Sequence, residues 1–516
     1  MNHNISEETL SKLSRFVSDQ LGLSFPKERF ADLKRGLVSA AGELDFMDAE
    51  ACMTWLLSSS LSRRQIEVLA SHLTIGETYF FRDRNLFKVM EEEIIPALVR
   101  KRRTGAGHLR IWSAGCATGE EAYSVAILLH KLIPDLEDWN ITIRATDINP
   151  GFLKKAEDGI YGEWSFREVP MWIRSYFIKD KDSRYRIVPW IKKMVNFSYL
   201  NLAEDSYPSL TGNTNAMDVI FCRNVLMYFE AGRAGSVIWK LYRALVDGGW
   251  LIVSPCEVSN EFFSPFATIQ YPGAILYRKD LARAGTAEIP AWKERALVPY
   301  PQFTCGPDSP GESPLNTIFT FPEPQPEPDS PLQPSHEVPE VPAPENHPYD
   351  QGLLYNQALD FYNQGLYPAA AALLIEWCSS NTDANAITLL ARAFANQGKL
   401  AEAGQWCEKA VALDKLNPAL HYLLGIIFYE LGRFDAAVAS LKRSLYLDQD
   451  FILAHFTLAN INRSAERFKE SNKSYKNALA LLNAMAPDRV IPESEGITAG
   501  RLKEIIKSTD GENQNE

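Results

Sequence analysis

The sequence has no long uninterrupted apolar run, although apolar residues make up 46% of its 516 positions. A membrane-spanning helix needs roughly 18 consecutive apolar residues, and no stretch approaches that length. Residues 1–16 also lack the basic region, apolar stretch and small-residue cleavage site of a secretion signal. We therefore expect a cytoplasmic protein that does not insert into a membrane.

The sequence also lacks closely spaced cysteine pairs and an excess of basic over acidic residues. The seven cysteines are scattered and include no C-x-x-C pair, so the sequence predicts neither a disulfide framework nor a metal site. The formal net charge of −12 argues against nucleic acid as the main partner, because phosphate binding needs a basic face.

Proline is concentrated in one segment. More than half of the 30 prolines lie between 281 and 350, where glutamate is frequent and aromatic residues are few. Such a stretch cannot bury enough apolar surface to fold, so we predict an extended linker over 282–349. Because a linker of this kind does not fix what it joins, we expect the parts on either side of it to fold and work independently.

Beyond the linker, the sequence repeats itself. NQGKL at 396–400, ELGRF at 430–434 and SAERF at 464–468 follow one another at intervals of 34 residues, and NQGLY at 363–367 adds a looser unit. This period resembles tetratricopeptide repeats, in which paired helices bury their apolar faces only against neighbouring pairs. We predict about four repeats that bind an unknown protein partner. A short helix formed by ITAGRLKEIIKS in the tail could cap them.

Before the linker, two patterns follow one another. Residues 1–75 show apolar positions at helical spacing, whereas segments with strand and helix patterns alternate from residue 109 onward. The alternation predicts a parallel sheet with crossover helices. Ligands in such sheets bind beyond the carboxyl ends of the strands, near the point where the strand order reverses.

A glycine turn ends the first predicted strand, in IWSAGCATGEEAYSVAILL at 111–129. Gly115 and Gly119 allow a ligand to approach the backbone closely. We expect Glu120 and Glu121 to lie beside that ligand, where their charges disfavour a pyrophosphate and therefore a dinucleotide. S-adenosylmethionine, with its cationic centre, ribose hydroxyls and ammonium group, would tolerate them. Thr118 and Glu121 could instead form only a capping box.

Two further strand ends carry polar residues. Asp147 ends the second predicted strand, where its carboxylate could accept hydrogen bonds from ribose hydroxyls or could merely cap the next helix. The fourth strand ends in FCRNVLMYF, which groups Arg223, Asn224 and Tyr228. This segment is unlike the D/N-P-P-Y loop of enzymes that methylate amines of nucleic acids.

Residues 1–280 closely resemble the CheR family, the chemotaxis receptor methyltransferases that esterify glutamate side chains on receptor helical bundles. The resemblance rests on LTIGETYFFRD at 73–83, SAGCATGEEAYS at 113–124, TDIN, NLAED at 201–205 and CRNVLMYF at 222–229, in the family's order. It implies S-adenosylmethionine as the cofactor. Together with the glycine turn, it marks as cofactor-binding residues Thr78, Arg82, Gly115, Glu121, Asp147, Asn201, Leu202, Asn224 and Val225. One departure is Gly76, where some members carry Asn and make a further contact.

The resemblance also implies that Arg82 and Tyr228 line the methyl end of the cofactor and orient the acceptor carboxylate. Arg82 could otherwise pair with Asp83 or Asp147, and Tyr228 could be a core residue. The sequence offers no Ser-His-Asp set and no obvious general base. A carboxylate acceptor needs no base, because it is ionised at pH 7.

The predicted fold is a Rossmann-like α/β methyltransferase sheet with an N-terminal helical domain and a C-terminal all-α repeat domain. The predicted divisions are a helical domain 1–75, a methyltransferase domain 76–281, a linker 282–349, repeats 350–485 and a tail 486–516.

The predicted activity is methyl transfer from S-adenosylmethionine to receptor glutamates, with repeats that localise or regulate the enzyme. The alternative is a binding scaffold with a cofactor-sensing or inactive methyltransferase domain. A basic stretch containing Lys27, Arg29, Lys34 and Arg35 could face an acidic receptor. Residues 183–200 lie where family members insert a small β subdomain that can grip a receptor tail peptide.

Overall fold

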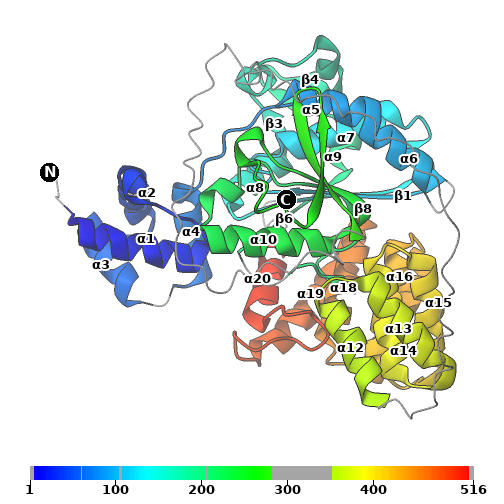
Figure 1. Ribbon diagram of the computed structural model, residues 1–516. Helices are drawn as coiled ribbons and strands as arrows, with labels where there is room; N and C mark the ends of the chain where they lie inside the picture. Colours follow the sequence, from blue (N-terminus) through cyan, green and yellow to red (C-terminus); the bar gives the residue numbers. More distant parts are fainter. Residues whose placement is uncertain (1–4, 60, 104–106, 204–206, 282–350, 511–516) are drawn as a thin grey trace, which may run out of the picture.

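The computed structural model describes the chain except for residues 1–4, 60, 104–106, 204–206, 282–350 and 511–516 (Figure 1). The predicted linker, 282–349, therefore lies outside the described residues. Within the described part, no helix is long and apolar enough to cross a membrane. The six cysteines of that part are all free, and no group of three or more potential metal ligands occurs there.

Four helices form the N-terminal part and enclose their own apolar core, as the helical spacing predicts. Leu13 and Val17 of the first helix are fully buried, because residues four apart share one face of a helix. Ser6 caps that helix through its side-chain oxygen, and Gly22 ends it in the left-handed conformation. The helices are α1 (Glu7–Leu21), α2 (Phe30–Glu43), α3 (Ala49–Ser58) and α4 (Arg63–Leu73).

A seven-stranded sheet follows, with the order β6-β2-β1-β7-β8-β10-β9. The first five strands in this order pair in parallel, and β10 pairs antiparallel with β8 and with β9. The sequence predicted the parallel strands but not the last two. The strands are β1 (His108–Ala114), β2 (Asn140–Asp147), β6 (Val195–Tyr199), β7 (Met217–Phe221), β8 (Leu245–Ile252), β9 (Phe266–Tyr271) and β10 (Ala274–Lys279).

Helices cover both faces of this sheet. Neighbouring residues of β1 point to opposite faces, so that Ile111 joins one core and Trp112 the other. Residues of α5, α6, α7 and α9 pack into the first core, and residues of α10 pack into the second. The helices of this part are α5 (Arg84–Val89), α6 (Ile95–Arg103), α7 (Glu120–Leu132), α8 (Pro150–Asp158), α9 (Pro189–Lys192) and α10 (Ala231–Ala244).

A small three-stranded antiparallel sheet is inserted between β2 and β6, in the order β3-β5-β4. Its strands are β3 (Ile160–Tyr161), β4 (Phe177–Lys179) and β5 (Tyr185–Ile187). The segment 183–200 that the sequence associates with such a subdomain thus contributes only β5 to it, followed by α9 and β6 of the main sheet.

The described C-terminal residues form four helix pairs and one further helix, which confirms the repeat architecture and the capping helix (Figure 1). Gly398 and Gly432 lie 34 residues apart, and both have a positive φ in the turn within a pair. The helices are α12 (Gln351–Asn363), α13 (Tyr367–Ser380), α14 (Ala384–Asn396), α15 (Leu400–Leu413), α16 (Pro418–Glu430), α17 (Phe434–Leu447), α18 (Ile452–Ser464), α19 (Phe468–Asn483) and α20 (Ala499–Asp510).

The repeats pack directly against the methyltransferase part, near the amino ends of the parallel strands. Arg110 Nη1 of β1 lies 3.3 Å from Glu430 Oε2 of α16, and both side chains are almost fully buried. Asn140 Nδ2, at the start of β2, donates a hydrogen bond of 2.6 Å to the Glu430 carbonyl oxygen. The expectation that nothing fixes the two parts relative to one another is therefore wrong, and that each part folds by itself stays a prediction. The composition of the linker indicates only how the linker itself behaves. The two parts are joined by buried residues that lie before and after it in the sequence.

Candidate active site

The glycine turn lies where the strand order reverses, between the carboxyl ends of β1 and β7. Gly115 and Gly119 both have a positive φ, and Gly119 is the N-cap of α7. The backbone N–H groups of Gly115 and Cys116 donate to the Thr146 carbonyl oxygen at 2.8 and 2.9 Å, which folds the turn over the end of β2. The turn therefore brings the backbone of β1 next to Asp147.

Asp147 ends β2 with its carboxylate in the cavity. Oδ2 accepts a hydrogen bond of 2.9 Å from Ala117 N, and Oδ1 accepts one of 2.8 Å from Asn149 N. Burial raises the pKa of Asp147 to about 6, although these hydrogen bonds act in the opposite direction. The cap of α8 is Asn149, whose side chain accepts from Phe152 N, so Asp147 itself is not the helix cap.

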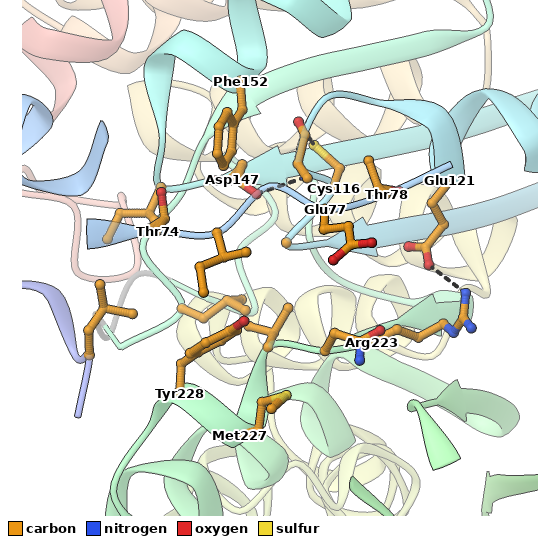
Figure 2. Close-up of a pocket in the computed structure, with 18 of the residues that line it drawn as sticks. Thr74, Glu77, Thr78, Cys116, Glu121, Asp147, Phe152, Arg223, Met227 and Tyr228 are labelled. Atoms are coloured by element: carbon orange, nitrogen blue, oxygen red, sulfur yellow. Dashed lines mark hydrogen bonds and ion pairs between the residues drawn. The ribbon is translucent and has the colours of Figure 1, made fainter. Parts of the chain in front are cut away.

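Glu121 reaches the cavity and forms an ion pair there. Its Oε2 lies 3.3 Å from Arg223 Nη1, and its Oε1 accepts a hydrogen bond of 2.8 Å from Ser113 Oγ (Figure 2). Arg223 is itself buried and also lies 3.5 Å from Asp83 Oδ2. The cavity thus holds an acidic and a basic group side by side.

Glu120 points away from the cavity, so only Glu121 of the two glutamates expected beside the ligand lines it. The Glu120 carboxylate accepts hydrogen bonds from Thr118 Oγ1 at 2.6 Å and from Ser165 Oγ at 3.0 Å. Neighbouring residues of a helix lie about 100° apart around its axis, so Glu120 and Glu121 cannot both point into the cavity. The alternative of a capping box formed by Thr118 and Glu121 is excluded, because the N-cap of α7 is Gly119 and no side chain caps it.

The loop after β7 is shaped by a buried carboxylate that the sequence did not suggest. Glu257 accepts hydrogen bonds from Asn224 N at 2.8 Å and Val225 N at 2.7 Å. Asn224 is held at φ 57°, a left-handed conformation that asparagine tolerates better than most residues. Glu257 therefore fixes the direction in which this loop presents Val225 and Tyr228 to the cavity.

The segment between α4 and α5 covers the cavity from the side of the N-terminal helices. Its backbone is tied to the sheet domain by hydrogen bonds from Phe80 N to Ser165 O at 3.0 Å and from Phe81 N to Ser124 Oγ at 2.9 Å. Arg82 Nη1 donates to the Glu77 carbonyl oxygen at 2.9 Å, and within the described part of the chain Arg82 forms an ion pair with neither Asp83 nor Asp147.

These elements enclose a cavity of about 400 Å³. Every site residue named from the sequence lines it: Thr78, Arg82, Gly115, Glu121, Asp147, Asn201, Leu202, Asn224, Val225 and Tyr228. Figure 2 shows Tyr228 lying across the cavity from Asp147. Tyr228 also packs against the core of the N-terminal helices, so it is partly a core residue, and its role toward the acceptor stays a prediction.

Known proteins resemble both parts of the chain. The model of the CheR methyltransferase, SAM binding domain matches residues 76–272, and two tetratricopeptide repeat models match 355–418 and 397–461. Chemotaxis protein methyltransferase 2 of Vibrio cholerae is 34% identical over 220 residues, which cover 42% of this chain and 74% of that protein. This chain belongs to the CheR family. The prediction of an enzyme of the chemotaxis protein methyltransferase type is thereby confirmed.

A second relative supports the same membership. The chemotaxis protein methyltransferase of Borreliella burgdorferi is 28% identical over 260 residues, which cover 50% of this chain and 90% of that protein. Among solved structures, MamA 41-end from Desulfovibrio magneticus RS-1 is similar over 26% of this chain and 77% of that chain, at a TM-score of 0.26 and 18% identity. A likeness of that size supports no conclusion about function.

Several residues in the cavity of this CheR-family chain were not identified from the sequence. Glu77, Cys116 and Phe152 line it; the first two lie within CheR motifs but were not named as site residues, and Phe152 lies outside those motifs. Phe152 also explains the departure at Gly76, because a Cβ there would overlap the Phe152 ring. The phenyl ring thus occupies space that a larger residue at position 76 would need.

Gly115→Ala is expected to destabilise the folded protein by about 1–2 kcal/mol and to weaken cofactor binding. The alanine would need a positive φ, and its Cβ would overlap Val225 Cγ2, which is part of the cavity wall. Thermal unfolding and calorimetry with S-adenosylhomocysteine measure both effects. Gly162→Ala is the matched control, because its Cβ would meet no atom within 4 Å. Equal behaviour of the two variants would contradict the prediction.

Proposed function

We propose that this chain transfers a methyl group from S-adenosylmethionine to glutamate side chains of chemoreceptor helical bundles, forming methyl esters. The observation that carries the proposal is the grouping of Asp147, the Glu121–Arg223 pair and Tyr228 around one cavity at the carboxyl edge of the sheet. Membership of the CheR family supports the methyl transfer.

The residues around the cavity fit S-adenosylmethionine. The Asp147 carboxylate is suited to accept hydrogen bonds from two ribose hydroxyls. Glu121 would hold the ammonium group of the methionine part of the cofactor, and Arg223 would hold its carboxylate, because each residue carries the opposite charge. Leu202 and Val225 offer apolar surface to the adenine ring. When bound, the cofactor supplies a methyl group on a positively charged sulfur.

The protein would contribute position and exclusion of water rather than acid–base chemistry. No histidine or lysine lines the cavity among the described residues. The acceptor carboxylate would bond to the methyl carbon from the side opposite sulfur, while the sulfur–methyl bond breaks and its electron pair is left on sulfur. Arg82 and Tyr228 would orient the acceptor, since both line the cavity and can donate hydrogen bonds. The negative charge of the acceptor carboxylate and the positive charge of the sulfur cancel as the methyl group is transferred, so a site without water favours the transfer.

Receptor docking would involve the N-terminal helices near Tyr228. Arg29 lies with its guanidinium carbon 5.3 Å from the centre of the Tyr228 ring, at the proposed acceptor end. Two other members of the basic stretch are already paired, Lys27 with Glu7 at 2.5 Å and Arg35 with Asp32 at 2.5 Å. The stretch therefore presents less free positive charge than its composition indicates. A grip on a receptor tail near 183–200 stays a prediction.

The repeats would regulate the enzyme by contact. The buried contacts between Arg110 and Glu430 favour this role over localisation by a flexible tether. The proposal also includes the predicted division of the chain into domains and a protein partner, of unknown identity, that the repeats bind.

Methyl label transferred from S-adenosylmethionine to receptor-containing membranes is expected to be released as methanol at high pH. Methyl esters are hydrolysed by base, whereas methylated amines are not. The measurement uses the full chain, with Tyr228→Phe as a variant that should lose most of the transfer while retaining cofactor binding. Label that survives alkali would contradict an ester product. Binding of S-adenosylhomocysteine without any transfer would favour the alternative, a cofactor-sensing scaffold.

A further inference from the structure

One wall of the cavity is formed by a segment that contacts the repeat domain on both of its flanks. Leu200, Asn201 and Leu202 line the cavity directly after β6, and Asn201 and Leu202 are almost fully buried. The segment belongs to no helix or strand, so its position depends on the residues that precede and follow it.

On the amino-terminal flank, the contact comes from α20. Arg501 Nη2 donates a hydrogen bond of 3.3 Å to the Tyr199 carbonyl oxygen, and its guanidinium carbon lies 4.2 Å from the centre of the Tyr199 ring. Tyr199 pairs with Asp147 across β2 and β6, and Leu200 N donates to the Asp147 carbonyl oxygen at 3.1 Å. Arg501 therefore holds the backbone beside the carboxylate that we assign to the ribose.

On the carboxyl-terminal flank, the contact comes from the repeats. Tyr207 Oη donates to the Leu202 carbonyl oxygen at 2.8 Å. Three residues later, Leu210 is buried in the apolar core of the repeats, and its N–H donates to Glu495 Oε2 at 2.7 Å. The Thr211 hydroxyl lies 3.0 Å from the Tyr422 hydroxyl of α16. The hydrogen bond of Tyr207 thus connects the cavity wall to residues that enter the repeat domain at Leu210.

We propose that Arg501 is a positioning residue for cofactor binding and that docking of the repeats, through Tyr199 and Leu210, sets the affinity of the cavity for S-adenosylmethionine. The proposal rests on the proposed function. A partner that draws the repeats away from the methyltransferase part would release both flanks of the wall and lower cofactor affinity. The repeats would then regulate the enzyme at a site far from their own surface, because one segment belongs to both domains.

Arg501→Ala in the full chain is expected to raise the dissociation constant for S-adenosylhomocysteine about three- to tenfold, the effect of losing one hydrogen bond that orients the wall. Arg501→Lys should recover part of the loss, because it retains a cation near Tyr199. Lys507→Ala is the matched control, since Lys507 is exposed on the same helix. In steady-state assays, the KM for S-adenosylmethionine should rise while kcat and the KM for the acceptor stay unchanged, which a general loss of structure would not produce.

Leu210→Asp provides an independent variant, because it places a carboxylate in the apolar core of the repeats beside Glu495. It should weaken binding at least as much as Arg501→Ala. If the wild-type chain binds S-adenosylhomocysteine and either variant binds it equally well, the coupling is wrong and the proposed function stands. If the wild-type chain does not bind it, the proposed function fails and this inference fails with it.

Discussion

Asp147→Asn is expected to weaken binding of S-adenosylhomocysteine by about 1.5–3 kcal/mol, the range for hydrogen bonds to a charged group. The carboxylate ends β2 inside the cavity, and each of its oxygens already accepts one backbone hydrogen bond. An asparagine retains the shape of the side chain but replaces one acceptor by a donor, so it cannot accept hydrogen bonds from both ribose hydroxyls. Calorimetry on the full chain measures the loss. A variant that binds as tightly as the wild type would show that the ribose contact is wrongly assigned.

The same residue should make cofactor binding depend on pH. Burial raises the pKa of Asp147 to about 6, so the carboxylate is ionised above this value and protonated below it. Because the ionised form is the better acceptor, affinity should be constant above about pH 7 and fall about tenfold per pH unit well below pH 6. Asp147→Asn should remove this dependence. A wild-type affinity that stays constant from pH 5 to pH 8 would contradict the prediction.

The site could be predicted largely because its residues follow the strands that carry them. Gly115, Asp147 and Asn224 each lie within a few residues of a strand end, and the parallel strands bring those ends to one edge of the sheet. Local pattern and topology therefore suffice to bring these three residues together. The CheR motifs supplied Thr78 and Leu202, whose positions come from irregular segments.

What the sequence could not predict depends on contacts between distant segments. Glu120 and Glu121 are adjacent and alike, and only Ser165 and Arg223, from other parts of the chain, decide which of them faces the cavity. Glu257 holds the loop after β7 from more than 30 residues away, and no spacing indicates it. In each case the partner of a polar group, rather than its type, determines its role.

The contact between the repeats and the sheet was missed for the same reason. Arg110 lies in β1 between two apolar residues, Leu109 and Ile111. A charged residue at such a position is rarely buried unless it is paired, so the sequence did contain a signal. Its partner, however, is Glu430, which lies beyond the linker in a different domain. A proline-rich segment gives no information on whether the surfaces beside it meet.

Glu430→Ala is expected to lower the free energy of unfolding by about 3–5 kcal/mol, the cost of leaving a buried charge without its partner. The Arg110 and Glu430 side chains are only 2% and 4% exposed, so water cannot replace the lost carboxylate. Burial also raises the pKa of Glu430, against the effect of the Arg110 charge, which shows that desolvation opposes the pair. Urea unfolding of the full chain measures the effect.

Two comparisons separate this loss from a general weakening of the interface. Glu466→Ala breaks the pair with Lys193, which joins the same two domains at 3.0 Å but is 75% and 68% exposed, and it should change stability by less than about 1 kcal/mol. Replacing both Arg110 and Glu430 by Met should restore most of the stability, because neither charge of this pair is then left buried without its partner. If Glu430→Ala costs no more than Glu466→Ala, the repeats do not hold Arg110 out of water, and the docked arrangement of the two domains is wrong.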